Sequence, residues 1–138
     1  MIEAVLFVCN MNSVRSPMAA ALLKARPGRR ITVDSAGVYE GALDPFVEAV
    51  LGEIGLAITG HEPKSLDAIR TEDFDLIVAL TQDAALELAR RTPPARVEFW
   101  DIENPSGASG GRNAILGAYR EVRDELTRRI AARFKEQS

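Results

Sequence analysis

The amino-acid sequence predicts an α/β fold of three layers, in which helices cover both faces of a four-stranded parallel sheet. Short, almost wholly apolar runs recur along the chain, and they have the length of strands that are buried on both faces. Between them lie stretches whose apolar residues follow helical spacing. Strands that alternate with helices join through right-handed crossovers, which make neighbouring strands parallel.

The first half of the chain supplies two strands and two helices. Ala4 to Val8 (AVLFV) is predicted as the first strand. Ser16-Pro17 opens the first helix, because proline in a first turn loses no hydrogen bond, and PGRR ends it. Ile31 to Gly37 (ITVDSAG) is the second strand with its turn. The next helix begins at DPF and ends near Gly55, a typical C-cap residue.

The second half repeats the alternation. SLDAIR supplies one or two helical turns, and Phe74 to Leu80 (FDLIVAL) is the third buried strand. Thr81 caps the helix TQDAALELARR, and Arg96 to Trp100 is a short fourth strand. The last helix carries an apolar stripe, in which Tyr119 is expected to be a core residue: Ile115, Tyr119, Val122, Leu126, Ile130 and Phe134.

The composition is that of one soluble globular domain, which we expect to span residues 1–138. Apolar residues make up 46% of the chain and charged residues 27%. A net charge of -3 argues against a nucleic-acid partner. No apolar run approaches the roughly 20 residues of a membrane helix, and the N-terminus lacks the basic residues of a signal peptide. We therefore expect a cytoplasmic protein with no membrane partner.

The chain has a single cysteine and a single histidine, which limits the disulfides and metal sites that it can form. One thiol forms neither an internal disulfide nor a site with several thiolate ligands, and one histidine adds too little for structural zinc. We therefore expect no metal and no cofactor.

The segment Cys9 to Ser16 (CNMNSVRS) has the pattern of an oxyanion-binding loop between a strand and a helix. Arg15, at the start of the helix, can grip two oxygens of a phosphate. Cys9 then lies beneath the phosphorus, and Ser16 can donate a hydrogen bond to its thiolate. The expected phosphate-binding residues are Asn10, Met11, Asn12, Ser13, Val14 and Arg15.

Three segments converge on one edge of the predicted sheet. Cys9, Ser35 and the segment from Trp100 to Pro105 each follow or end a strand. Ligands on parallel sheets bind beyond the carboxyl ends of the strands, so this edge is the expected active site.

FVCNMNSVRSPMA resembles the phosphate loop of the low-molecular-weight protein tyrosine phosphatases, whose pattern is roughly V-C-x-G-N-x-x-R-S-P. DSAGV, DPF, GL..TGH, FDLIVAL and WDIENP follow in the family's order, and the bacterial branch is the most similar. The resemblance implies the family's flavodoxin-like fold and a phosphomonoester hydrolase that forms a phosphocysteine on Cys9. Its implied ligands are phosphate, sulfate or vanadate-like oxyanions, and its implied substrate is a phosphorylated small molecule or a phosphoprotein. It also implies that Ser35 and His61 hold Asn12 in a left-handed conformation, which asparagine tolerates.

The sequence departs from the family pattern at three places. Asn104-Pro105 stands where the family has an Asp-Pro pair that protonates the leaving oxygen, and an amide cannot do so. Asp101 and Glu103 lie nearby, and Glu103 is the candidate substitute acid. Met11 replaces a glycine and could reshape the loop. SGASG replaces an aromatic wall, which leaves Tyr39 and Trp100 as candidate aromatic contacts.

Three functions therefore stay open. The first is a phosphatase whose general acid is impaired, and the second is a pseudophosphatase that binds phosphate or phosphotyrosine without catalysis. The third is an arsenate reductase, because thioredoxin-coupled arsenate reductases share the fold and the loop. With Cys9 alone, an arsenate reductase would need an external thiol.

Overall fold

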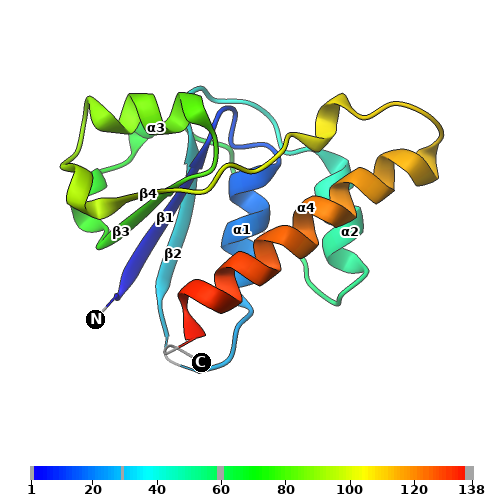
Figure 1. Cartoon of the computed structure of the whole chain (residues 1–138), viewed down its shortest axis with the longest axis horizontal. Coiled ribbons are helices and arrows are strands. Elements are labelled where there is room, and N and C mark those ends of the chain that lie inside the picture. Colours follow the sequence, from blue (N-terminus) through cyan, green and yellow to red (C-terminus); the bar gives the residue numbers. More distant parts are fainter. Residues whose placement is uncertain (1, 29, 59–60, 136–138) are drawn as a thin grey trace.

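The computed structural model describes residues 2–28, 30–58 and 61–135, and it contains a parallel sheet with the strand order β2-β1-β3-β4 (Figure 1). The strands are β1 (Ala4–Cys9), β2 (Thr32–Gly37), β3 (Leu76–Ala79) and β4 (Val97–Phe99). The strand order reverses between β1 and β3, where ligands of such sheets bind. The predicted α/β class and the four parallel strands are confirmed.

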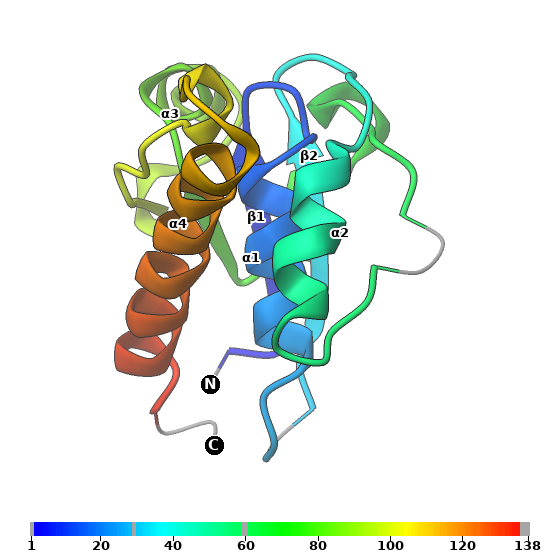
Figure 2. The ribbon, with the colours of Figure 1, turned by 90° about the vertical axis from the view of Figure 1, so that its right-hand side faces the viewer.

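Helices cover both faces of the sheet. Figure 2 shows α1 (Arg15–Lys24), α2 (Pro45–Gly52) and α4 (Arg112–Arg133) together on one face. The other face is covered by α3 (Gln82–Ala89). Single turns of 3₁₀ helix lie at Leu66–Ala68, Thr71–Asp73, Pro94–Arg96 and Pro105–Gly107.

The side chains of β1 explain why its sequence is apolar throughout. Successive side chains of a strand point to opposite faces. Val5, Phe7 and Cys9 therefore join the core beneath α1, α2 and α4, while Leu6 and Val8 join the core beneath α3. β1 thus brings Cys9 to the carboxyl edge of the sheet from a strand that is buried on both faces.

The boundaries of the strands and of α3 lie within two residues of the predicted ones, and the C-cap of α2 differs from the predicted one. Glu53 is the C-cap there, and Gly55, which the sequence suggests as the C-cap, lies beyond it with a φ of 79°. Thr81 caps α3 by accepting from the Ala84 N–H at 3.0 Å, as predicted. Tyr119 is buried, as predicted. Parts of PGRR (residue 29) and TGH (residues 59–60) lie outside the described residues.

None of the helices within the described ranges combines the length and the apolar character that crossing a membrane would require.

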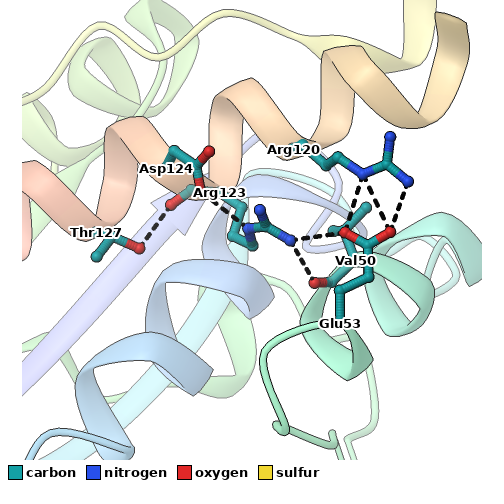
Figure 3. A network of polar contacts seen from close by, with 6 residues as sticks. All are labelled: Val50, Glu53, Arg120, Arg123, Asp124 and Thr127. Atoms are coloured by element: carbon teal, nitrogen blue, oxygen red, sulfur yellow. Dashed lines mark hydrogen bonds and ion pairs between the residues drawn. The ribbon is translucent and has the colours of Figure 1, made fainter.

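A buried arginine joins α4 to the end of α2 (Figure 3). Arg123 is 9% exposed and donates from Nη1 to the Val50 carbonyl and to Glu53, at 2.8 Å each. Its Nε donates to Asp124 at 3.0 Å, and Glu53 also accepts from Arg120 at 2.7 Å. Carbonyl groups in the last turn of a helix lack intrahelical donors, so Arg123 supplies the partner that Val50 needs.

The ion pairs of this network lower the pKa of Glu53 from 4.5 to about 2, chiefly through the hydrogen bond from Arg120 and then through Arg123. Because the folded-state pKa lies below the unfolded value, the stabilisation is complete above pH 4.5. It is lost as the pH falls through about 2.

Replacing Arg123 by Met is expected to lower the free energy of unfolding by about 2 kcal/mol, because the Val50 carbonyl loses its buried donor. The midpoint of urea denaturation measures this change. Arg120→Met is the matched control, since it removes an exposed partner of the same Glu53 and should shift the midpoint less. An equal shift in both variants would show that the buried carbonyl contact contributes nothing.

Candidate functional site

The loop between β1 and α1 lies at the carboxyl edge of the sheet, beside the point where the strand order reverses. Residues 10–14 form this loop, and α1 begins directly after it at Arg15. The N–H groups of the first helical turn have no intrahelical acceptor, so the start of α1 presents partial positive charge.

Donors from outside the loop fix the orientation of its peptide groups. Four loop carbonyls accept hydrogen bonds: Cys9 from Val38 N (2.9 Å), Asn10 from Tyr39 N (2.8 Å), Asn12 from His61 Nε2 (3.4 Å) and Ser13 from Asp44 N (3.1 Å). In a planar trans peptide the N–H points opposite to the carbonyl. The following N–H groups, those of Asn10, Met11, Ser13 and Val14, therefore point away from these donors, toward the inside of the loop. This arrangement suits an oxyanion.

Asn12 is the structural centre of the loop. It is fully buried and has a φ of 53°, the left-handed conformation that the family resemblance implies. Its Nδ2 donates to Ser35 Oγ at 3.0 Å and to Ser16 Oγ at 2.8 Å, and its Oδ1 accepts from the Lys64 N–H at 3.0 Å. The structure thus brings Asn12, Ser35 and His61 together. Lys64 contributes through its backbone N–H, and no sequence pattern indicates such a contribution.

His61 supports the loop as a neutral donor. A carbonyl oxygen can only accept, so the contact with Asn12 requires the Nε2–H form of the ring. Burial lowers the pKa of His61, against a smaller raising effect of this hydrogen bond. The ring therefore stays neutral at pH 7, which suits a positioning residue.

Cys9 and Ser16 are in direct contact beneath the loop. Cys9 Sγ lies 3.0 Å from Ser16 Oγ, and both residues are buried. The same hydroxyl also lies 3.2 Å from the Ala36 carbonyl. Ser16 carries one hydroxyl hydrogen, so it can donate to a Cys9 thiolate or, when Cys9 is a thiol, to Ala36.

Arg15 connects the loop to the segment after β4. Its Nη1 donates to the Ile102 carbonyl at 2.9 Å, which leaves its other N–H groups available for an oxyanion. Burial lowers the pKa of Arg15, while the negative charges of Cys9 and Asp101 raise it. Because an arginine remains charged at pH 7 even so, Arg15 supplies a fixed positive charge beside Cys9.

Three other loop side chains do not face a bound oxyanion. Asn10 accepts from Thr81 Oγ1 at 2.6 Å and donates to Asp83 at 3.3 Å, so only its backbone is available. Val14 is buried in the core, and Met11 is 43% exposed. Met11 does not have a positive φ, so the glycine usual at this position is not needed here for its conformation.

Asp44 is a residue that the sequence left without a role in the site. Its N–H holds Ser13, its Oδ1 caps α2 by accepting from Phe46 N at 2.9 Å, and its Oδ2 accepts from the Tyr119 hydroxyl. Burial and this hydrogen bond raise the pKa of Tyr119. The DPF motif could have indicated the helix cap, but not the backbone contact to the loop.

Asn104 occupies the position where the family has its acid, and its side chain forms hydrogen bonds within its own turn. Its Oδ1 accepts from Ser106 N at 3.1 Å and from Ser106 Oγ at 2.7 Å. Asp101, Glu103 and Asn104 are exposed and line a groove of about 760 Å³ between this segment and α4. Trp100 is buried, with its ring 5.9 Å from that of Phe7, so it belongs to the core rather than to a substrate-binding wall.

Comparisons with known proteins identify the family and the fold. The family model of the low molecular weight phosphotyrosine protein phosphatases matches residues 4–137. An arsenate reductase of Bacillus subtilis (strain 168) is 30% identical over 93% of this chain and 92% of that protein. A low molecular weight protein tyrosine phosphatase of T. tengcongensis has a TM-score of 0.81 and 27% identity, covering 97% of this chain and 99% of that one. The YwlE arginine phosphatase of Geobacillus stearothermophilus has a TM-score of 0.76 and 29% identity, covering 97% and 92%.

Proposed function

Because the chain belongs to the low molecular weight phosphotyrosine protein phosphatase family, we propose that it hydrolyses phosphate monoesters with Cys9 as the nucleophile. The observation that carries this proposal is the contact of Cys9 Sγ with Ser16 Oγ at 3.0 Å, beside a loop whose carbonyls are bonded to donors outside it. Arg15 adds a fixed positive charge at the same place. A phosphate held there has the sulfur below it and donors around its oxygens.

The reaction has two displacements. In the first, the Cys9 thiolate attacks phosphorus, an S–P bond forms, the ester P–O bond breaks and the leaving oxygen takes up a proton. In the second, water attacks the phosphocysteine, phosphate leaves and the thiolate is regenerated. Arg15 and the N–H groups stabilise the charge on the equatorial oxygens in both steps. Ser16 favours the thiolate as nucleophile and as leaving group by donating its hydrogen bond to sulfur.

The leaving oxygen lacks its usual proton donor. Asn104 cannot provide a proton, because its side chain is an amide. Asp101 and Glu103, the candidate substitute acid, are both exposed residues of the groove, and Asp101 is the one whose charge acts on Arg15. We therefore expect slow turnover that favours esters with good leaving groups.

Hydrolysis of p-nitrophenyl phosphate by the wild type and by Cys9→Ser tests the proposal. The proposal requires turnover that disappears in Cys9→Ser, and Glu103→Gln and Asp101→Asn reveal whether either acid contributes. Equal rates in the wild type and Cys9→Ser would refute the hydrolase. If phosphate then still protected the fold against heat, the protein would be a phosphate-binding pseudophosphatase, which Asn104 favours.

The relative named arsenate reductase makes that reaction the second candidate. The Cys9 thiolate would attack arsenate, an S–As bond would form, and one As–O bond would break with its oxygen leaving as water. An external thiol would then attack the Cys9 sulfur, the S–As bond would break with its electron pair going to arsenic, and arsenite would be released. The two thiols supply the two electrons and end as a disulfide. Because the chain has one cysteine, arsenite formation must depend on added thiol. Arsenite released with glutathione or a glutaredoxin system, and lost in Cys9→Ser, would establish this activity.

A further inference from the structure

We propose that Met11 is a specificity-determining residue whose side chain forms an apolar wall at the mouth of the phosphate loop. This wall favours phosphate esters of aromatic alcohols over inorganic oxyanions and over esters with small polar alcohols. The inference rests on the proposed function, since it names the class of leaving group that the same site accepts.

The backbone N–H of Met11 and its side chain have different surroundings. The carbonyl of Asn10 is held outward by the Tyr39 N–H, so the Met11 N–H points into the loop. Met11 is 43% exposed, although Cys9 and Asn12 on the same loop are buried. Met11 therefore offers its N–H to a bound oxyanion and its side chain to whatever extends out of the loop.

Gly41 provides the space in which the Met11 side chain lies. A Cβ atom at position 41 would be 3.0 Å from Met11 Cβ and 3.3 Å from Met11 Cε, at the far end of the side chain. The thioether therefore lies over the segment that follows β2 instead of extending freely into solvent. An apolar side chain that already packs against its own chain loses less rotamer freedom on contact with a ligand than a freely extended one.

Tyr39 stands in the same segment and extends the apolar rim. Its N–H is bonded to the loop at Asn10, and its side chain is 62% exposed. The segment Ser106 to Gly110 (SGASG), where the family has its aromatic wall, carries small side chains only. The large apolar side chains beside the loop are therefore those of Met11 and Tyr39.

The chemistry of methionine selects the class of ligand. A thioether makes favourable contacts with aromatic rings and adapts its shape to them. Inorganic phosphate and arsenate end at their own oxygens within the loop, so they gain nothing from this wall. An aryl ester places its ring beyond the bridging oxygen, which is where Met11 is exposed.

The test measures binding in the Cys9→Ser background, where ligands are not consumed. The ratio of the affinities for phenyl phosphate and inorganic phosphate is measured by calorimetry. Met11→Gly, which restores the usual family residue, is expected to lower this ratio roughly three- to tenfold. Met11→Leu keeps an apolar side chain and should lose less. Leu86→Ala removes another exposed apolar side chain, on α3, and should leave the ratio unchanged.

Three results would overturn the proposal. The first is a parent protein that binds phenyl phosphate no better than inorganic phosphate. The second is a ratio that Met11→Gly leaves unchanged, and the third is a ratio that Leu86→Ala lowers equally. A failure of the proposed function is a separate result, because it is an absence of Cys9-dependent hydrolysis in the wild type, and the binding ratio does not depend on hydrolysis.

Discussion

Replacing Asn104 by Asp is expected to accelerate hydrolysis of phosphate esters by about 10²-fold where the leaving group is a poor one. A general acid contributes most when the departing oxygen would otherwise leave as a strong base. The gain should therefore be large for phenyl phosphate and small for p-nitrophenyl phosphate, whose anion is a weak base. The aspartate can accept the same bonds from Ser106 that Asn104 accepts, so the turn has no reason to change.

The measurement is kcat against pH for both esters. In the Asp variant the kcat for phenyl phosphate should fall as the pH rises and the new acid ionises. Asn104→Ser is the matched control, because serine can also cap the turn but brings no acid. A similar gain in the serine variant, or a gain that is equal for both esters, would mean that the segment has been rearranged and that no proton donor has been restored.

The fold could be predicted from sequence because its signals are local. The apolar run of β1 and the cap at Thr81 each indicate the local structure of the same residues, and the structure has both at the predicted positions. The end of α2 differs because Gly55 marks a turn beyond the helix, and the helix itself stops where Arg123 takes up the Val50 carbonyl. That contact joins residues 73 positions apart, so no local pattern could indicate it.

The candidate site was predictable only in part, for a similar reason. Cys9, Arg15 and Ser16 were identified by spacing and residue type. The donors that orient the loop include the backbone N–H groups of Val38, Tyr39 and Asp44, and every residue except proline carries such a group. The direction of the Asn10 side chain depends on Thr81, 71 positions away. Only the folded chain brings these partners together.

Replacing Gly37 by Ala is expected to distort the loop of residues 10–14, because Gly37 lies against the backbone of this loop. A Cβ atom there would lie 2.5 Å from the Tyr39 carbonyl oxygen, 2.6 Å from Asn12 N and 2.8 Å from the Met11 carbonyl carbon. All three are backbone atoms, which cannot swing aside as a flexible side chain can. Gly37 does not have a positive φ, so its own conformation does not require glycine. Glycine is required here because the loop backbone approaches it closely. Overpacking of this kind costs about 3 kcal/mol at the upper end of the usual range.

The variant should therefore show a lower free energy of unfolding and at least about a tenfold weaker affinity for phosphate, since Asn12 and Met11 are the residues displaced. Urea denaturation with and without phosphate measures both quantities. Gly117→Ala is the matched control: the position lies within α4 with nothing inside 4 Å of the added Cβ, so alanine there should stabilise the protein by about 0.5–1 kcal/mol. If Gly37→Ala bound phosphate as tightly as the wild type, the close contact between β2 and the loop would not be what holds the loop in shape. The orientation of its N–H groups would then depend on the hydrogen bonds to its carbonyls alone.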